Sequence, residues 1–239
     1  MLETDSVPDQ RPIIVPFLKW AGGKRWLVSN HPELFPESFD TYLEPFLGSG
    51  AVYFHLQPDA AILGDMNAEL IGTYDAIKEN WRPIHKTLKS YHNQHNKDFY
   101  YDIRSKSFRS PAKKAAKFIY LNRTCFNGIY RVNLNGTFNV PIGTKKNVIL
   151  DSDDFESVSN VLQNAELCAT DFQTVIDAAQ KDDFVFIDPP YTVKHNLNGF
   201  VKYNEHIFSW DDQVRLRDCI DNAVARGVKV LLTLSLIHI

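Results

Sequence analysis

An aspartate, two prolines and a tyrosine directly follow an apolar run in FVFIDPPY, residues 184–191. The Asp188 carboxylate and the Pro189 carbonyl can both accept hydrogen bonds from a planar amine, such as the exocyclic amine of a nucleobase or an amide nitrogen. These bonds would draw the nitrogen lone pair out of conjugation and direct it toward an electrophile. The two prolines, Pro189 and Pro190, stiffen the loop, and Tyr191 can stack on a planar base. The alternative is an ordinary strand-ending turn, because Asp and Pro are common in turns.

A second candidate site lies in EPFLGSGAV, residues 44–52. Gly48 and Gly50, between an expected strand and an expected helix, let a ligand approach the backbone closely. A dinucleotide fingerprint would need a third small residue where Tyr53 stands, which disfavours a nicotinamide oxidoreductase. Asp65 ends the next expected strand and can accept hydrogen bonds from ribose hydroxyls. The pattern favours an adenosine-containing cofactor without a pyrophosphate over the alternative, a tight turn with a helix-capping acid.

Strands that alternate with helices must position both motifs, and this alternation predicts a parallel sheet. The expected strands are 41–46, 60–65, 165–169, 183–188 and 228–233, and the expected helices are 48–56, 67–80, 171–180 and 209–227. Asn67 is a good N-cap for the second of these helices. The last helix should bury an apolar stripe formed by Leu216, Ile220, Ala223 and Val224.

The middle of the chain breaks this alternation. It looks helical from 81 to 121, and RVNLNGTFNV at 131–140 predicts a hairpin that turns at Asn135-Gly136. We therefore predict one α/β domain in two parts, residues 1–80 and 151–239, with an insert at residues 81–150.

Charge is distributed unevenly between these parts. Residues 78–146 hold 15 Lys/Arg and 3 Asp/Glu, a net charge of +12, whereas the rest of the chain holds 11 basic and 26 acidic residues. Such asymmetry predicts that the insert binds a polyanion. Three widely spaced cysteines predict neither a disulfide framework nor a zinc site and fit a reducing, cytoplasmic compartment. The apolar runs are too short to span a membrane, and we expect no signal peptide.

Five motifs in this order resemble the Dam-type DNA adenine-N6 methyltransferases of the alpha group: FLKWAGGKRWL, EPFLGSG, GDMN, LNRTCFNGIYRVNLNGTFNVPIG and FIDPPY. The resemblance runs from Pro16 to Thr233. It implies a Rossmann-like, S-adenosylmethionine-dependent methyltransferase sheet with an inserted, mainly helical target-recognition domain. It also implies a monomer that flips adenine out of duplex DNA, with GATC the expected target. No metal is expected, because the sulfonium methyl is already electrophilic.

The resemblance also assigns site residues. Trp20 and Lys24 would hold the adenine and carboxylate ends of the cofactor, and Asp65 would hold the ribose. Glu44, Phe46, Gly48 and Gly50 would form the cofactor loop. The catalytic loop would be Asp188, Pro189, Pro190 and Tyr191, with Asp188 also close to the cofactor.

For DNA, the resemblance implies that Phe126 inserts into the duplex and that Asn127 contacts the orphaned base. Lys19 would read the outer guanine of GATC, since Lys or Arg on guanine is the commonest specific major-groove contact. The further base contacts would be Ile129, Arg131 and Pro141, and the phosphate contacts Arg123, Lys145 and Lys146. The alternative for Phe126 and Ile129 is the core of a small domain. The family more often has tyrosine where Phe126 stands, so a hydroxyl contact is not expected.

The end of the chain departs from the family. After the strand at 228–233 the family has a polar segment and a strand hairpin, whereas this chain reads LSLIHI. We expect the C-terminal strands to be missing, which would expose an apolar sheet edge. Two alternatives stay open: a catalytically inactive, truncated DNA-binding remnant, and an N6 or amide methyltransferase acting on RNA or protein. The sequence does not distinguish a role in restriction-modification from repair, regulation or a phage.

Overall fold

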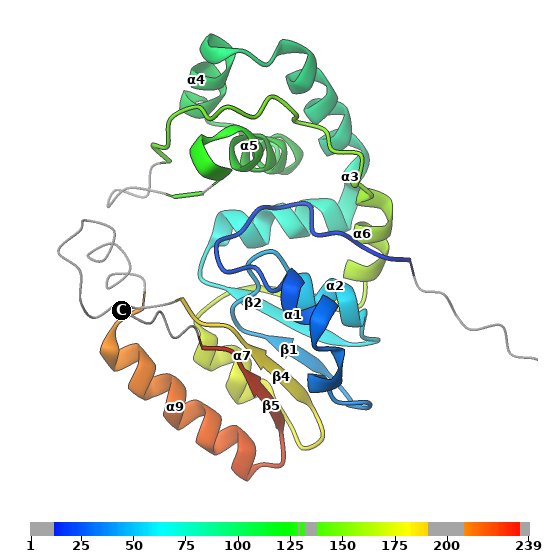
Figure 1. The fold of residues 1–239 in the computed structure, drawn as a ribbon, viewed down its shortest axis with the longest axis vertical. Helices are drawn as coiled ribbons and strands as arrows, with labels where there is room; N and C mark the ends of the chain where they lie inside the picture. The colour runs from blue at the N-terminus through cyan, green and yellow to red at the C-terminus, as the bar shows by residue number, and fades with distance from the viewer. Residues whose placement is uncertain (1–11, 129, 132–137, 191–207, 235–239) are drawn as a thin grey trace, which may run out of the picture.

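The computed structural model describes residues 12–128, 130–131, 138–190 and 208–234 of the 239-residue chain. Within these ranges a five-stranded sheet has the order β3-β2-β1-β4-β5 (Figure 1). All its strand pairs are parallel, which confirms the parallel α/β sheet predicted from the sequence. The strands are β1 Tyr42–Glu44, β2 Ala61–Asp65, β3 Ala165–Ala169, β4 Phe184–Ile187 and β5 Lys229–Leu232.

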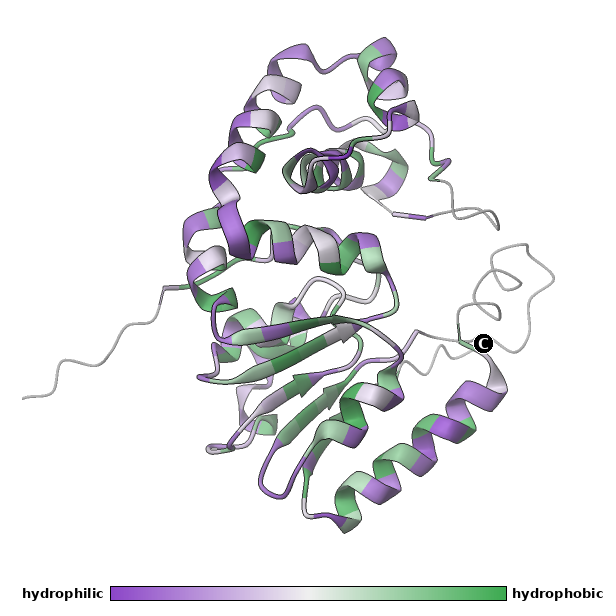
Figure 2. Ribbon diagram, turned by 180° about the vertical axis from the view of Figure 1, so that it is seen from behind, coloured by the Kyte–Doolittle hydropathy of each residue, from purple (hydrophilic) through white to green (hydrophobic). Residues whose placement is uncertain are grey.

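The two faces of the sheet are covered by different helices, because successive side chains of a strand point to opposite faces. From β4, Phe184 and Phe186 join the core formed with α1 (Arg25–Asn30), α2 (Ala51–Leu56) and α3 (Ala68–Gln94). Val185 and Ile187 join the core formed with α7 (Phe172–Ala178) and α9 (Trp210–Ala225). The result is a Rossmann-like three-layer fold, and Figure 2 shows strands rich in hydrophobic residues between the helical layers.

Local signals at the helix termini explain why the sequence pattern located these elements well. The Asn67 side chain accepts from the backbone N–H groups of Glu69 and Leu70, which caps α3. Ser209 and Asp212 form a capping box at the start of α9.

One part of the expected stripe on α9 is wrong. Leu216 and Ala223 are buried and Ile220 is half-buried, but Val224 is 55% exposed. Cys219 is buried in its place. Cys219 lies three residues after Leu216 and four before Ala223, so these three share one face of the helix.

The insert begins at a break in α3. Asn80 has extended backbone (φ −162°, ψ 97°), so α3 consists of two helical segments that meet there. Residue 80 is also the last residue of the first part predicted from the sequence, and the division into domains stays a prediction. The second segment of α3 is followed by α4 (Lys97–Ser105) and α5 (Pro111–Thr124), and the chain returns through α6 (Phe155–Leu162). Figure 1 shows α4 and α5 on the far side of α3 from the sheet. The turn predicted at Asn135-Gly136 lies outside the described residues.

Candidate functional site

Four polar side chains gather at the carboxyl edge of the sheet. Glu44 ends β1, Asp65 ends β2, Asp188 follows β4, and Thr233 follows β5. The strand order places β1 beside β4, so the chain runs outward in opposite directions from this pair. In open α/β sheets, ligands bind at such a switch point, outside the carboxyl ends of the strands.

The Asp188 carboxylate is fixed by donors from two distant segments. Lys24 donates from Nζ to Oδ2 at 2.6 Å, and Thr233 donates from Oγ1 to Oδ1 at 2.8 Å. The Lys24 side chain is only 6% exposed and that of Asp188 17%, so water screens this ion pair weakly. The neighbouring Pro189 is buried and Pro190 is exposed. Tyr191 lies outside the described residues.

Glu44 is a buried acid beside this pair. The Tyr42 hydroxyl donates to its Oε2 at 2.8 Å. Burial raises the pKa of Glu44 well above its usual value, and the charges of Asp188 and Asp65 raise it further. A raised pKa favours the uncharged form of Glu44, so this residue is a buried, neutral acid that is hydrogen-bonded to Tyr42 beside the Lys24–Asp188 pair.

Asp65 is held by the backbone on both sides. Its Oδ2 accepts from the N–H of Gly48 at 3.1 Å, and its Oδ1 accepts from the N–H of Asn67 at 2.9 Å. Burial raises the pKa of Asp65, and these two amide bonds oppose that shift. Each carboxylate oxygen has a second lone pair, so Asp65 can still accept from ligand hydroxyls.

The glycine loop meets the Trp20 indole. Gly48 and Gly50 have φ angles of +49° and +64°, a region that favours glycine. A Cβ added to Gly48 would lie 2.6 Å from Trp20 Cδ1, so the indole packs directly on this backbone. Trp20 also stacks on Phe118 of α5, with centroids 6.4 Å apart. The structure thus brings Trp20, the glycine loop and Asp65 together.

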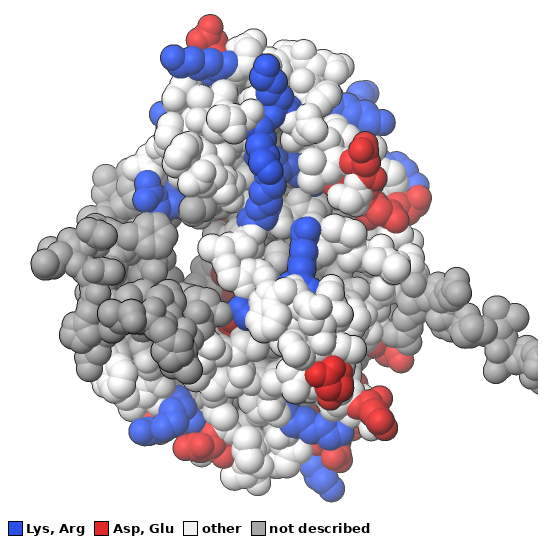
Figure 3. All heavy atoms as spheres, in the orientation of Figure 1, with Lys and Arg blue, Asp and Glu red and all other residues white. Residues whose placement is uncertain are grey.

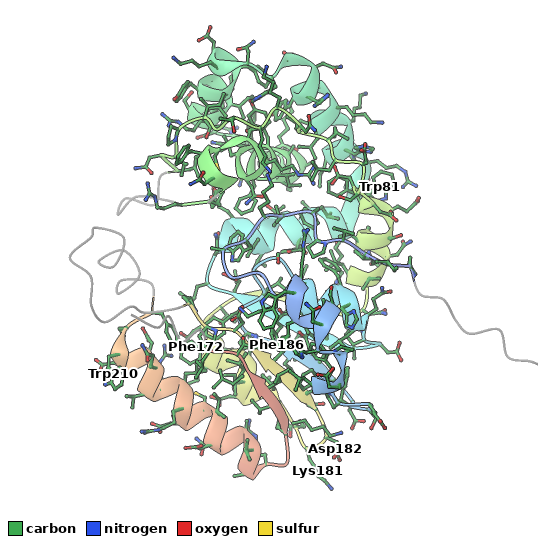
Figure 4. The ribbon with its side chains drawn as sticks, viewed as in Figure 1. Trp81, Phe172, Lys181, Asp182, Phe186 and Trp210 are labelled. Carbon is green, nitrogen blue, oxygen red and sulfur yellow. The ribbon has the colours of Figure 1, made fainter. Side chains whose placement is uncertain are left out.

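Phe46 belongs to an aromatic cluster at the same edge. Its ring stacks on Phe172 with centroids 5.5 Å apart and meets Phe208 edge-on at 5.7 Å. Arg215 lies over Phe172, 4.3 Å from the ring centroid, and its guanidinium pairs with Asp171. Figure 4 shows Phe172 at this end of the sheet.

Four members of this edge were not predicted from the sequence: Tyr42, Asp171, Phe172 and Thr233. A signal was available for two of them, because Asp171 follows one expected strand of the parallel sheet and Thr233 ends another. Their hydrogen-bonding partners, Arg215 for Asp171 and Asp188 for Thr233, lie in distant segments and could not be predicted from the sequence.

A second group of expected residues lies at the end of α5. Phe126–Gly128 form a 3-10 turn, in which Phe126 is 55% exposed and Asn127 is exposed with φ +57°. The Phe126 N–H donates to the Pro141 carbonyl at 2.9 Å, which joins the turn to the returning chain. Lys19 is half-buried beside this turn, and a Cβ added to Gly128 would lie 2.9 Å from Lys19 Cδ. Ile129 lies outside the described residues.

The expected phosphate contact of Arg123 requires correction. Its side chain is 1% exposed and makes a bidentate ion pair with Asp153, at 2.6 and 2.5 Å. It also donates to the carbonyls of Phe17 and Val148, each within 3 Å. A guanidinium enclosed in this way cannot reach a phosphate, so Arg123 is a structural residue.

The other expected DNA contacts among the described residues are exposed or half-buried. Lys145 and Lys146 are exposed, Arg131 is half-buried and Pro141 is exposed. Figure 3 shows Lys and Arg forming a column down the front of the insert toward the sheet domain. This column fits the anionic backbone of a nucleic acid.

These features define a class: a Rossmann-like α/β protein with acidic side chains at the carboxyl edge of its sheet and a basic, helical segment beside it. Comparison with known sequences identifies the class further. Residues 20–238 match the family described as D12 class N6 adenine-specific DNA methyltransferase. This match covers most of the chain, so the chain belongs to that family.

Individual relatives agree with the family assignment. The type II methyltransferase M1.LlaDCHI of Lactococcus lactis subsp. cremoris is 39% identical over 92% of this chain and 81% of its own length. The type II methyltransferase M.MjaIII of Methanocaldococcus jannaschii is 35% identical over 93% of this chain and 84% of its own. The DNA adenine methylase of Vibrio cholerae is 33% identical over 91% and 80%, respectively. The Dam-type resemblance is confirmed.

The described residues contain neither a membrane-spanning helix nor a metal-binding cluster. No helix there is long and apolar enough to cross a membrane. No group of three or more His, Cys, Asp or Glu side chains in the same ranges could hold a metal ion.

Proposed function

We propose that this chain transfers a methyl group from S-adenosylmethionine to N6 of adenine in duplex DNA at GATC, after flipping the adenine out of the helix. One observation carries the proposal: Lys24 and Thr233 fix the Asp188 carboxylate at the switch point of the sheet. A fixed acceptor there can receive an N–H of the adenine amine, with the Pro189 carbonyl as the second acceptor. Tyr191 would stack on the base.

The carboxyl edge fits the proposed cofactor. The acidic side chains of Glu44, Asp65 and Asp188 line the edge of the sheet that would receive the sulfonium ion. Asp65 has acceptor capacity for ribose hydroxyls, and the Trp20 indole on Gly48 offers a face for the adenine. When bound, the cofactor supplies a methyl carbon that is already electrophilic.

The roles of the chain's own residues then follow. Asp188 orients N6 and stabilises the positive charge that N6 gains as its bond to carbon forms. Lys24 holds Asp188 in place, so its ammonium acts on the catalytic loop as well as beside the cofactor. Glu44, Phe46 and Gly50 complete the cofactor loop.

On the DNA side, Phe126 would insert between base pairs and Asn127 would contact the orphaned base. Lys19, Ile129, Arg131 and Pro141 would contact base edges, and Lys145 and Lys146 would contact phosphates. A chain that modifies cellular DNA would work in the cytoplasm of a bacterium, an archaeon or a phage-infected cell. The type II relatives favour a restriction-modification role.

Methylation of defined duplexes tests this function. We expect N6-methyladenine, quantified by mass spectrometry, on a GATC duplex and not on a matched duplex without GATC. Product on both DNA duplexes would contradict the GATC target, and product only on an RNA duplex would contradict the DNA substrate. No product on any duplex would favour the inactive remnant.

Phe126→Ala should slow methylation of a fully paired GATC duplex by about tenfold or more, since extruding a paired base costs a few kcal/mol. The effect should shrink on a duplex with an abasic position opposite the target adenine, where little pairing remains to be broken. The readout is the ratio of single-turnover rates on the two duplexes.

Leu34→Ala removes another exposed apolar side chain, 49% exposed and far from the insert in sequence, and serves as the control. This variant should keep the wild-type ratio. Equal slowing of Phe126→Ala on both duplexes would argue against insertion.

A further inference from the structure

The backbone of Lys19 is bound by a single buried side chain. Asn122, in the last turns of α5, is 0% exposed. Its Oδ1 accepts from the Lys19 N–H at 2.9 Å, and its Nδ2 donates to the Lys19 carbonyl at 2.7 Å. This reciprocal pair fixes the orientation of the amide, because only one assignment satisfies both bonds. It also satisfies both backbone groups of Lys19 without any strand partner.

The same end of α5 forms the turn that carries Phe126 and Asn127. The Gly128 N–H donates to the Cys125 carbonyl at 3.1 Å, and the Gly143 N–H donates to the Thr124 carbonyl at 2.8 Å. Lys19 crosses this turn, since its Cδ lies within 2.9 Å of a Cβ placed on Gly128, whose φ is +67°. Asn122 therefore connects Lys19, which immediately precedes Trp20, to the Phe126–Gly128 turn.

The ammonium of Lys19 lies in an environment that favours a ligand acceptor. Burial lowers its pKa, and the neighbouring Lys145 and the more weakly acting Arg123 lower it further. An acceptor such as guanine O6 or N7 would stabilise the charged ammonium and so oppose this lowering of its pKa.

We propose that Asn122 is a positioning residue for base recognition: it holds Lys19 against the Phe126–Gly128 turn, so that Lys19 meets the outer base pair while Phe126 enters the duplex. This inference rests on the proposed function, in which Lys19 reads the outer guanine. Asn122 itself touches no DNA and acts through Lys19.

The test compares a GATC duplex with one whose outer guanines carry carbon in place of N7. The quantity measured is the ratio of kcat/KM on the two duplexes for wild type, Lys19→Met, Asn122→Ala and the double variant. Wild type should prefer the unmodified duplex by about tenfold. Lys19→Met should bring this ratio close to one, and Asn122→Ala should do the same. The double variant should lose nothing further, because both changes remove one interaction.

A matched control separates positioning from general damage. Thr124 is also buried at the end of α5, but its Oγ1 donates to the Tyr120 carbonyl of its own helix. Thr124→Val should keep the tenfold ratio. Thermal midpoints of all variants, measured in parallel, show that each is folded at the assay temperature.

The outcomes are distinct. A wild-type ratio near one, or an unchanged ratio in Lys19→Met, would overturn the role of Lys19 and the inference with it. If Lys19→Met loses the ratio but Asn122→Ala keeps it, the proposed function stands and the role of Asn122 is overturned. Loss of the ratio in Thr124→Val, or additive losses in the double variant, would also overturn that role.

Discussion

Methyl transfer should fall roughly a hundred- to a thousandfold when Asp188 is replaced with alanine, the range found when a preorganised polar group is removed from an active site. Both carboxylate oxygens are already fixed, by Lys24 at 2.6 Å and Thr233 at 2.8 Å, so the acceptor needs no reorganisation as charge develops on the amine. The loss should appear in the single-turnover rate at saturating cofactor and DNA.

The control is Asp182→Asn, which neutralises a carboxylate at the opposite end of β4. Asp182 is exposed, and Figure 4 shows it at the other end of the sheet from Phe172. Its φ is +69°, which asparagine tolerates, so the fold and the rate should stay unchanged. Asp188→Ala removes the carboxylate that pairs with Lys24. The thermal midpoint of this variant must therefore be measured first. Normal turnover by a folded Asp188→Ala variant would remove Asp188 from the mechanism.

The parallel sheet and its acidic edge could be predicted because their signals are local. β3 occupies residues 165–169, as the apolar run indicated, and Asn67 caps α3 through its own side chain. Once Glu44, Asp65 and Asp188 are placed at the carboxyl ends of parallel strands, they must lie on one edge of the sheet. The strand order that brings β1 beside β4 was not predicted, because it depends on pairings between strands far apart in the sequence.

Contacts between distant segments could not be predicted. Lys24 and Asp188 are 164 residues apart, and Lys19 and Asn122 are 103 apart. Arg123 shows the limit of reasoning from charge: it belongs to a strongly basic segment, but the fold places Asp153 opposite it in the core. Val224 shows the limit of periodicity, because it follows the buried Ala223 by about 100° around the helix and so leaves the apolar face.

Arg123→Met should lower the free energy of unfolding by about 3–5 kcal/mol, the usual effect of breaking a buried ion pair. The substitution leaves the Asp153 carboxylate, 3% exposed, without its guanidinium. It also removes donors from the Phe17 and Val148 carbonyls. A loss of this size is a large fraction of the stability of a typical domain. Denaturant unfolding at equilibrium measures it.

Arg82→Met is the matched control, because Arg82 is 71% exposed and its ion pair with Glu156 is long, at 3.5 Å. It should lower the free energy of unfolding by less than about 1 kcal/mol.

A DNA-binding measurement separates the structural role of Arg123 from a role in recognition. At a temperature below its thermal midpoint, Arg123→Met should keep the wild-type salt dependence of DNA affinity. Lys146→Met, which removes an exposed cation, should reduce that slope by about one. A reduced slope with undiminished stability in Arg123→Met would return Arg123 to the DNA interface, and it would mean that the Asp153 pair opens when DNA binds.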